Sequence, residues 1–213
     1  MAEKYAVKTG NWSDATVWNG GTKPGASDNV YANGFVVTID EDVTVLSLRS
    51  QAGATAVEGG GFATSGSVTI TADVYAGGSS ASMDTLRVNS GGVLIGNSTG
   101  GSATSKRGTY CINGGYQIGN STGGSGLSSY GTYCTTGGYQ VVGQITDATA
   151  PGVYGSNASF LFFNGLGLGD ISGSGNTELS QTDYLSLVTE HLWGPVFLAA
   201  KHSCETCTAK NPN

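Results

Sequence analysis

The stretch that decides the fold is IGNSTGGS, which occupies residues 95–102 and returns unchanged at residues 118–125. Two further strings return at the same offset: GTYC at 108–111 recurs at 131–134, and GGYQ at 114–117 recurs at 137–140. A fixed period of roughly 20 to 50 residues is typical of proteins that stack one supersecondary unit on the next. The repeat therefore predicts a solenoid.

Each repeat contains segments in which apolar and polar residues alternate, which is the pattern of a strand. Successive side chains of a strand point to opposite faces, so a strand that lines a core has one buried row and one exposed row. In the first segment we expect the more apolar row to face the core and to stack in register from coil to coil. The expected inward row is Val93, Ile95, Tyr116, Ile118, Tyr139 and Val141, and the expected outward row is Leu94, Gln117 and Gln140.

A second segment of the repeat reads Tyr-Cys-Ile at residues 110–112 and Tyr-Cys-Thr at residues 133–135. Tyr and Cys are both often buried, so the inward row of this segment stays open between them. Gly-Gly pairs at the corners allow tight turns between the segments. Strands of successive coils then pair in parallel, about 4.8 Å apart along the axis.

These features predict an all-β protein: a parallel β-helix (solenoid) of about five coils with a period near 23 residues and a small C-terminal α-helical cap. The helix is expected because Ser180–Asp183 resembles a capping box, and apolar residues follow at helical spacing as far as Gly194 and Pro195. The predicted division of the chain is an N-terminal cap segment at 1–34, coils at 35–145, irregular β structure with the capping helix at 146–200, and a polar tail at 201–213.

Composition excludes several classes of protein. Glycine contributes 36 of the 213 residues and proline only 4, which fits tight turns between short strands better than a disordered linker. Charged residues make up 11%, against a usual fraction of about a quarter, and the net charge is −6, so nucleic-acid binding is not expected. No stretch approaches the ~18 apolar residues of a membrane span and no signal peptide is visible, so we expect synthesis in a cytoplasm and no membrane partner.

Catalysis is not expected, because the most regular part of the chain lacks the necessary groups. Solenoids that cleave sugars use paired carboxylates on one face, yet residues 85–146 contain no Asp or Glu. With two histidines and no Gly-x-Ser-x-Gly elbow, a serine-type triad is not predicted, and no cofactor is implied. Acidic residues that remain for a catalytic pair lie towards the ends, at 40–42 and at Asp147, Asp170 and Glu178.

The four cysteines fall into two pairs. Cys111 and Cys134 are one period apart and are expected to stack on neighbouring coils. Residues stacked in parallel point their side chains the same way, so a ladder of reduced thiols that fills space is favoured over a disulfide. Cys204, Cys207 and His202 offer three zinc ligands in the tail, but a structural site needs a fourth, so metal binding there stays open.

Other residues also recur at equivalent positions of neighbouring coils. Asn97 and Asn120 are expected to form an asparagine ladder in which each amide bonds the next. Recurring threonines raise the idea of an ice-binding array, but the Thr-x-Thr pattern is not sustained. Two tyrosine pairs are interpreted as packing in or beside the core, because a buried ring contributes a large apolar area, with a sugar-binding aromatic stripe as the alternative. These pairs are Tyr110 with Tyr133 and Tyr116 with Tyr139.

The N-terminal part of the chain carries four short motifs in order. They are Asn-Trp-Ser-Asp at 11–14, Val-Trp-Asn-Gly-Gly at 17–21, Lys-Pro-Gly-Ala-Ser-Asp at 23–28 and Val-Val-Thr-Ile-Asp-Glu-Asp-Val at 36–43. This segment resembles the start of parallel β-helix modules in phage virion proteins and in large bacterial surface proteins. The resemblance is close as far as the end of the fourth motif and extends loosely to about residue 145.

The resemblance implies a non-enzymatic structural protein of a virion, made in the host cytoplasm, and for a short chain a phage capsid decoration (cement) protein. Such a protein is expected to bind itself, as a homotrimer, and a larger shell or fibre assembly. The alternatives are a phage tail fibre or tailspike that binds host glycans, and a surface adhesin. The candidate contact anchors, which fit a role in capping the core equally well, are Trp12, Trp18, Phe162 and Phe163.

Overall fold

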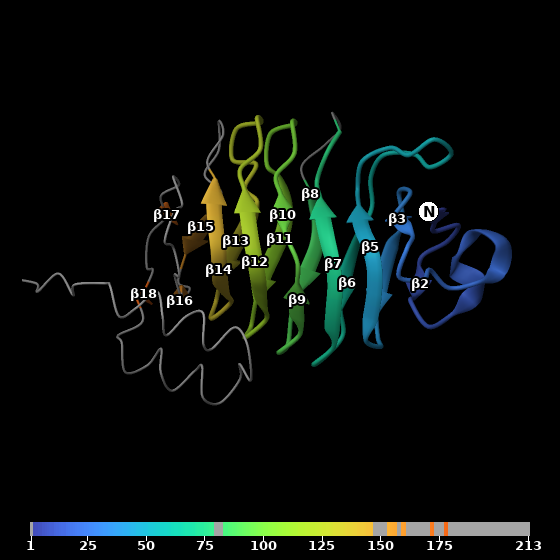
Figure 1. Ribbon diagram of the computed structural model, residues 1–213, viewed down its shortest axis with the longest axis horizontal. Coiled ribbons are helices and arrows are strands. Elements are labelled where there is room, and N and C mark those ends of the chain that lie inside the picture. The colour runs from blue at the N-terminus through green and yellow to red at the C-terminus, as the bar shows by residue number, and fades with distance from the viewer. Residues whose placement is uncertain are drawn as a thin grey trace, which may run out of the picture.

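The computed structural model describes residues 2–78, 83–146, 153–156, 159–160, 171–172 and 177–178. In this part of the chain nearly all regular structure is β-strand, and the strands lie side by side along the long axis of a rod (Figure 1). The rod is a β-solenoid of about six turns with a period near 23 residues, which confirms the predicted all-β solenoid. There is one turn more than expected, because strand pairing already begins at Glu3.

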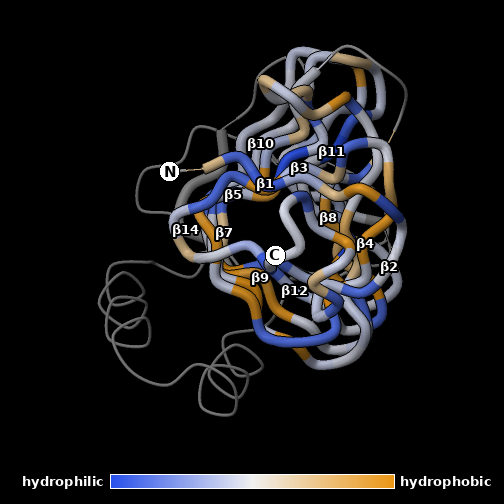
Figure 2. Tube along the Cα trace, turned by 90° about the vertical axis from the view of Figure 1, so that its right-hand side faces the viewer, coloured by the Kyte–Doolittle hydropathy of each residue, from blue (hydrophilic) through white to orange (hydrophobic). Residues whose placement is uncertain are grey.

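Two sheets form opposite walls of the rod, as the view along its axis shows (Figure 2). The first sheet contains β1 (Glu3–Tyr5), β3 (Asn29–Tyr31), β5 (Val43–Arg49), β7 (Thr69–Tyr75), β10 (Ser98–Thr99), β12 (Tyr116–Thr122) and β14 (Tyr139–Thr146), with β9 (Val93–Ile95) between β7 and β12. The second sheet contains β2 (Gly10–Asn11), β4 (Val36–Ile39), β6 (Gly61–Thr64), β8 (Met83–Val88), β11 (Lys106–Ile112), β13 (Thr132–Thr135), β15 (Val153–Ser156) and β17 (Ile171–Ser172). A separate two-stranded sheet pairs β16 (Ser159–Phe160) with β18 (Thr177–Glu178).

The sequence repeat sets the strand register in the middle of the rod. Strands of successive turns pair in parallel, and the residues predicted to stack are direct register partners. Each turn therefore places the same side chain over its copy in the turn before. The pairs are Ile95 with Ile118, Ile118 with Val141, Tyr116 with Tyr139, and Cys111 with Cys134.

The facing of the stacked row is the reverse of the prediction. Leu94, Gln117 and Gln140, which were expected to point outward, are buried. In the row that was expected inside, Ile95 is 42% exposed. Successive residues of a strand point to opposite faces, so assigning one residue to the wrong face reverses the facing of the whole row. The half-buried members of the outward row are Val93, Tyr116, Ile118 and Tyr139.

The interior of the rod changes from apolar to polar along its axis. Three columns of buried residues, two in the first sheet and one in the second, carry apolar side chains in the early turns and hydroxyl or amide side chains in later ones, although the second-sheet column returns to an apolar side chain at Val153. In the first sheet, one column reads Val30, Leu48, Val74, Ser98 and Ser121, and the other reads Val43, Ile70, Leu94, Gln117 and Gln140. The column of the second sheet reads Val37, Phe62, Leu86, Thr109, Thr132 and Val153.

The polar residues of the core bond largely to one another, and Gln140 Oε1 is an exception among the described residues. Gln117 Oε1 accepts hydrogen bonds from Ser98 Oγ at 2.9 Å and from Thr132 Oγ1 at 2.7 Å. Gln117 Nε2 donates to the carbonyl oxygen of Gly96 at 3.2 Å, and Gln140 Nε2 donates in the same manner one turn later. A buried polar group is tolerated when its hydrogen bonds are made inside the protein. The buried glutamines are therefore structural residues of the core.

A left-handed corner precedes the first-sheet strand in each of the regular turns. Asn113 and Gly114 have φ angles of 52° and 78°, and the equivalent residues one period earlier and later also have positive φ. Two consecutive positive φ angles are typical of type I′ turns, which favour Asn-Gly. The next residue, Gly115, approaches the turn below so closely that a Cβ atom would lie 2.2 Å from the carbonyl oxygen of Val88. The corner thus needs glycine both for its backbone angle and for its close approach.

The N-terminal end of the core is closed by two tryptophans. Trp12 and Trp18 are buried and meet edge to face, with ring centroids 4.6 Å apart. Trp18 Nε1 donates a hydrogen bond to the carbonyl oxygen of Trp12 at 3.0 Å, and the Trp12 ring lies 6.2 Å from that of Phe62. Because both rings are buried, they cap the core and are not surface contact anchors.

The outer edge of β1 is covered by the segment that follows β2. This segment contains two short 3-10 turns, η1 (Ala15–Val17) and η2 (Asn19–Gly21). The Tyr5 N–H donates to Asn19 Oδ1 at 2.8 Å, and Lys4 Nζ donates to the Asn19 carbonyl oxygen at 3.2 Å. A strand edge covered in this way cannot pair with another chain.

Several predicted features lie outside the described residues. They include the aromatic residues Phe162 and Phe163, the capping helix after Ser180, and the polar tail at 201–213 with its Cys204, Cys207 and His202. The predicted C-terminal cap is therefore not confirmed.

Candidate functional site

The most distinctive surface of the described chain is a column of tyrosines on the outer face of the second sheet. Arg87, Tyr110, Tyr133 and Tyr154 are register partners on the successive strands β8, β11, β13 and β15. Their chain neighbours Val88, Cys111 and Cys134 are buried, so alternation turns the column outward. With Arg107 and Tyr130, these residues form a surface that we call the arginine–tyrosine face.

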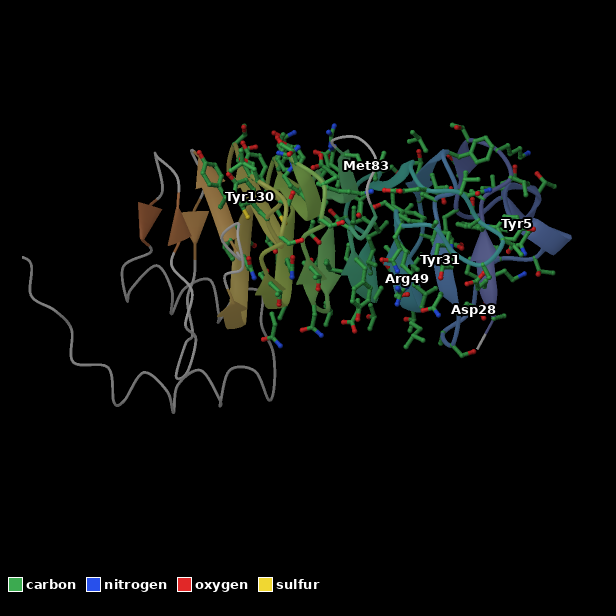
Figure 3. All side chains as sticks on the ribbon, turned by 90° about the horizontal axis from the view of Figure 1, so that it is seen from above. Tyr5, Asp28, Tyr31, Arg49, Met83 and Tyr130 are labelled. Carbon is green, nitrogen blue, oxygen red and sulfur yellow. The ribbon has the colours of Figure 1, made fainter. Side chains whose placement is uncertain are left out.

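The rings of this face stack on one another along the rod. Tyr133 and Tyr154 lie 5.3 Å apart between centroids with an angle of 12° between their planes. Tyr130, which immediately precedes β13, stacks on Tyr154 at 4.6 Å, and Tyr110 is tilted against Tyr133 at 5.2 Å. Tyr130 and Met83 lie on the same flank of the rod, opposite Tyr31 and Arg49 (Figure 3). Rings that stack in this way shield part of one another's faces.

Two guanidinium groups lie against these rings. The Arg107 guanidinium carbon is 4.4 Å from the ring centroid of Tyr133 and 5.2 Å from that of Tyr110. The Arg87 guanidinium carbon is 5.1 Å from the Tyr110 centroid. A cation within about 6 Å of an aromatic centroid is attracted by the ring. The tyrosines therefore hold both arginines at one end of the column.

Asp84 is the carboxylate that orients the two arginines. One of its oxygens lies 2.6 Å from Arg107 Nε, and the other lies 3.3 Å from a terminal nitrogen of Arg87. The Asp84 side chain is only 7% exposed, whereas the Arg87 side chain is 53% exposed. The Arg107 contact is an ion pair without an aligned hydrogen bond. Two cations share one anion here, so the cluster carries a net charge of about +1.

A pocket of about 430 Å³ opens beside the two arginines. Pockets of roughly 300–1,000 Å³ are typical of small-molecule sites. Polar groups form one part of its lining and apolar side chains form the rest. The residues of the lining are Asp84, Arg87, Arg107, Val36, Ala63 and Met83, together with Gly60, Gly61 and Phe62, whose side chain is buried in the core.

The Tyr133 hydroxyl stays protonated at neutral pH. Burial raises the pKa of Tyr133 above its ordinary value, although the nearby Arg107 lowers it in part. The face offers phenol hydroxyl groups, which can donate or accept hydrogen bonds. Tyr110 shows this capacity, because its hydroxyl is 2.8 Å from Thr135 Oγ1.

The second tyrosine pair lies on the opposite wall. Tyr116 and Tyr139 stack face to face with centroids 4.8 Å apart and an angle of 3° between planes. Burial raises the pKa of Tyr139 to about 12. Both rings are half-buried, so they pack on the outside of the first sheet and not within the core.

The cysteine and asparagine ladders both occur in the described chain. Cys111 and Cys134 are buried free thiols in direct register, and burial raises the pKa of Cys134 well above its ordinary value. A thiol with a raised pKa is a poor nucleophile and a poor metal ligand. At the asparagine position the bond differs from the expected amide-to-amide bond, because the backbone N–H of Asn120 donates to Asn97 Oδ1 at 3.2 Å. The ladder also starts one turn earlier, where Asp73 Oδ1 accepts from the Asn97 side chain at 2.9 Å.

The acidic triplet at residues 40–42 is occupied by structural contacts. Asp40 accepts hydrogen bonds from the Ser13 hydroxyl at 2.6 Å and from its N–H at 3.0 Å. Burial alone would raise the pKa of Asp40, but the Ser13 bonds bring it below its ordinary value. Glu41 pairs with Lys23, and Asp42 accepts from the Thr69 N–H. These carboxylates hold turns together and do not face one another as an acid–base pair.

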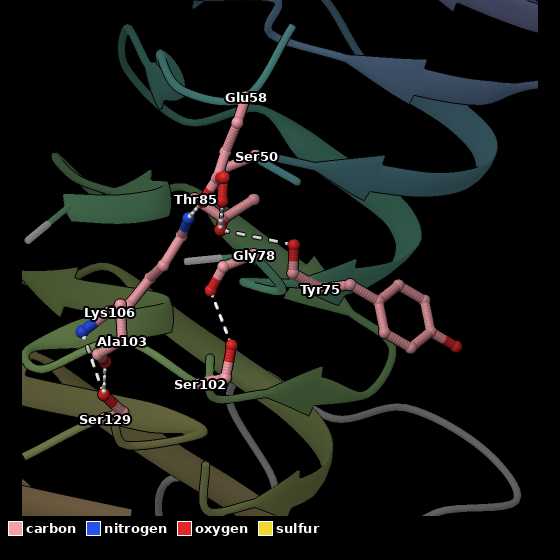
Figure 4. A network of polar contacts seen from close by, with 9 residues as sticks. All are labelled: Ser50, Glu58, Tyr75, Gly78, Thr85, Ser102, Ala103, Lys106 and Ser129. Carbon is pink, nitrogen blue, oxygen red and sulfur yellow. Dashed lines mark hydrogen bonds and ion pairs between the residues drawn. The ribbon is translucent and has the colours of Figure 1, made fainter. Parts of the chain in front are cut away.

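A buried ion pair ties together turns that lie far apart in sequence (Figure 4). Lys106, at the start of β11, is fully buried, and its Nζ contacts the carboxylate of Glu58, whose side chain is 18% exposed. The Lys106 N–H donates to Ser129 Oγ at 3.1 Å. Nearby, Ser50 and Thr85 join their hydroxyls at 2.8 Å. This network fastens the corner loops to the strands beside them.

Sequence reasoning missed Asp84, Arg87 and Arg107, although the repeat contained a signal for all three. Asp84 and Arg107 are one period apart and lie side by side in register, as do Arg87 and Tyr110. Pairing every charged residue with the residue one period away would have placed the ion pair and the cation on the ring.

Among the residues described, no three His, Cys, Asp or Glu side chains gather closely enough to hold a metal ion. The described part of the chain also has no helix of sufficient length and apolarity to cross a membrane. Comparison with family models, curated proteins and solved structures finds no match to this chain.

Proposed function

We propose that this chain is a non-enzymatic structural protein of a virion, and specifically a phage capsid decoration protein. The observation that carries the proposal is the parallel strand ladder, which runs from Glu3 to Thr146 in the first sheet and from Gly10 to Ser172 in the second. A ladder of this kind makes a stiff rod, because each turn is fixed to the next by both sheets. Such a rod suits a part that must keep its shape outside a cell.

The absence of a catalytic constellation in the described chain supports a structural role. The acidic residues of the described turns form ion pairs and hydrogen bonds, as Asp40, Glu41, Asp42 and Asp84 do. Cleavage of a sugar chain requires a pair of carboxylates, one on each side of the bond that breaks, and residues 85–146 contain no Asp or Glu. Together with the resemblance of the N-terminal segment to virion modules, this favours support over catalysis.

Self-association is part of the proposal, as a homotrimer that attaches to a larger shell. The outer surface of the first sheet supplies an apolar stripe for such contacts, in which Ile95 is exposed and Ile118, Tyr116 and Tyr139 are half-buried. Aromatic side chains are enriched in the centres of protein interfaces. The stripe replaces the tryptophans as the candidate contact surface.

The test is to locate the chain on particles and to determine its oligomeric state. Antibody-labelled electron microscopy is expected to place the chain on heads, and sedimentation of the purified chain is expected to give three copies. Label on tails would favour the second candidate, a tail fibre that binds host glycans, which the tyrosine column of the arginine–tyrosine face supports. A monomer that is absent from particles, or one that hydrolyses glycans, would contradict the proposal.

A further inference from the structure

We propose that the pocket beside Arg87 and Arg107 binds a carboxylate that is carried on a ring with an apolar face. The ligand is either a free cyclic or aromatic acid or the acidic residue of a sugar chain, since both present the same chemistry. This inference does not depend on the structural role proposed above. It follows from the charge, the donors and the lining of the pocket.

The charge of the pocket calls for an anion. Arg87 and Arg107 supply two positive charges and Asp84 only one negative charge. A guanidinium has five N–H donors in a planar fork, and the ion pairs with Asp84 engage one nitrogen of each arginine among the described residues. The remaining donors match the two oxygens of a carboxylate, which guanidinium binds in a bidentate manner.

The net charge favours a carboxylate over a phosphate. A carboxylate carries one negative charge, which equals the excess of cation over anion in the cluster. A phosphate monoester carries about −1.5 to −2 at neutral pH, so part of its charge would remain unbalanced beside Asp84. Asp84, which is nearly buried, therefore favours a ligand with one negative charge over a ligand with two.

The lining also requires that the ligand have an apolar body. Val36, Ala63 and Met83 line the pocket beside the arginines, and Val36 is among the exposed apolar side chains of the rod. A small inorganic anion would leave this apolar part of the lining uncovered. A ring that carries a carboxylate covers it with one face and reaches the guanidinium groups with its acid group.

Binding is to be measured by calorimetry on the full chain with four probes: a hexuronic acid disaccharide, the matching neutral disaccharide, benzoate and inorganic phosphate. We expect the acidic disaccharide or benzoate to bind, with an affinity that falls as salt is added. Binding of benzoate alone identifies a free acid as the source, and binding of the disaccharide alone identifies a sugar chain. Failure of both acids to bind, or equal binding of the neutral sugar or of phosphate, would overturn the proposal.

Three variants separate this site from a general attraction to the rod. Arg87→Gln removes a half-exposed cation and is expected to weaken acid binding about tenfold or more. Asp84→Asn removes the competing carboxylate and is expected to tighten binding of the acid and to admit phosphate. Arg49→Gln is the matched control, because Arg49 also lies over a tyrosine, at 4.4 Å from the Tyr75 ring, but in the first sheet. Loss of binding in the Arg49 variant, or no change in the Arg87 variant, would contradict the site.

Discussion

Gln117 and Gln140 occupy the same internal column as Ile70 and Leu94 of earlier turns. An amide at such a position is stable only if its donors and acceptor find partners inside the rod. Ser98, Thr109 and Gln117 each follow an apolar register partner, so the three columns change from apolar to polar within one period of the chain. The polar core is therefore a property of several columns together and not of one residue.

Replacing Gln117 by Leu is expected to destabilise the protein although Leu is the more apolar residue. The Ser98 and Thr132 hydroxyls and the Gly96 carbonyl oxygen would lose a partner, which we expect to lower the free energy of unfolding by about 2–4 kcal/mol. Urea unfolding followed by circular dichroism measures this loss. Gln140→Leu is the matched control with a smaller expected loss, because Gln140 Oε1 has no hydrogen-bond partner among the described residues. Equal losses would contradict the interpretation.

The Glu58–Lys106 ion pair is expected to be asymmetric. Lys106 is fully buried while the Glu58 side chain retains 18% exposure, so only Glu58 has access to water when its partner is removed. Glu58→Gln leaves a buried cation without its counter-charge and is expected to cost about 3–5 kcal/mol. Lys106→Met keeps most of the apolar stem and is expected to cost less. The same urea experiment on both variants decides the order, and a larger loss for Lys106→Met would refute it.

At the scale of the strand, the sequence period predicted which residues stack but not which face they present. A constant spacing between repeats fixes which residues pair, whether their side chains point inward or outward. The predicted pairing of Ile95 with Ile118 is therefore confirmed. The predicted facing is wrong because it assigns the more apolar residues, Tyr116 and Ile118, to the core, whereas Gln117 is the buried residue. Hydrophobicity shows which face of a strand is buried only where the core is apolar. Here the core is polar, and a hydroxyl group from the other sheet donates a hydrogen bond to Gln117.

The candidate site was predictable in part. The Tyr110–Tyr133 pair follows directly from the repeat, and Asp84 with Arg107 follows from the same spacing applied to charges. Tyr130 and the pocket do not follow from it, because Tyr130 lies in a loop and the pocket depends on side chains of several strands. Contacts between a loop and a strand have no periodic signature.

The Asn113–Gly114–Gly115 corner gives a test at the scale of one turn. Gly114→Ala adds a Cβ where no atom lies within 4 Å, so its cost is the strain of a positive φ, about 1–2 kcal/mol. Gly115→Ala forces a Cβ against the Val88 carbonyl oxygen of the neighbouring turn and is expected to cost more, since the backbone of both turns must move. Thermal unfolding of the two variants measures the difference. A milder effect at Gly115 would show that the turns are not closely spaced there.

For the whole molecule, the equivalence of the regular turns implies that one of them can be removed. Deleting residues 109–131 joins Gly108 to Thr132, which is the same junction that Gly131 makes with Thr132. We expect the shortened chain to fold cooperatively into a rod about 4.8 Å shorter, because each turn contacts only its neighbours.

Circular dichroism and small-angle X-ray scattering test this expectation. The control is deletion of residues 109–120, about half a turn, which puts unlike strands in register and is expected to abolish folding. Folding of both deletions, or of neither, would contradict the equivalence of the turns.

The tryptophan-capped N-terminal end has a consequence for how copies of the chain can polymerise. A stack of parallel strands with a free edge is able to seed a fibril, because the unpaired backbone recruits a strand from another molecule. Beside the Trp12–Trp18 pair, the segment over β1 removes that recruiting edge from one end of the first sheet. The first sheet therefore cannot be extended by another copy at this end, so growth through that sheet is confined to the opposite end.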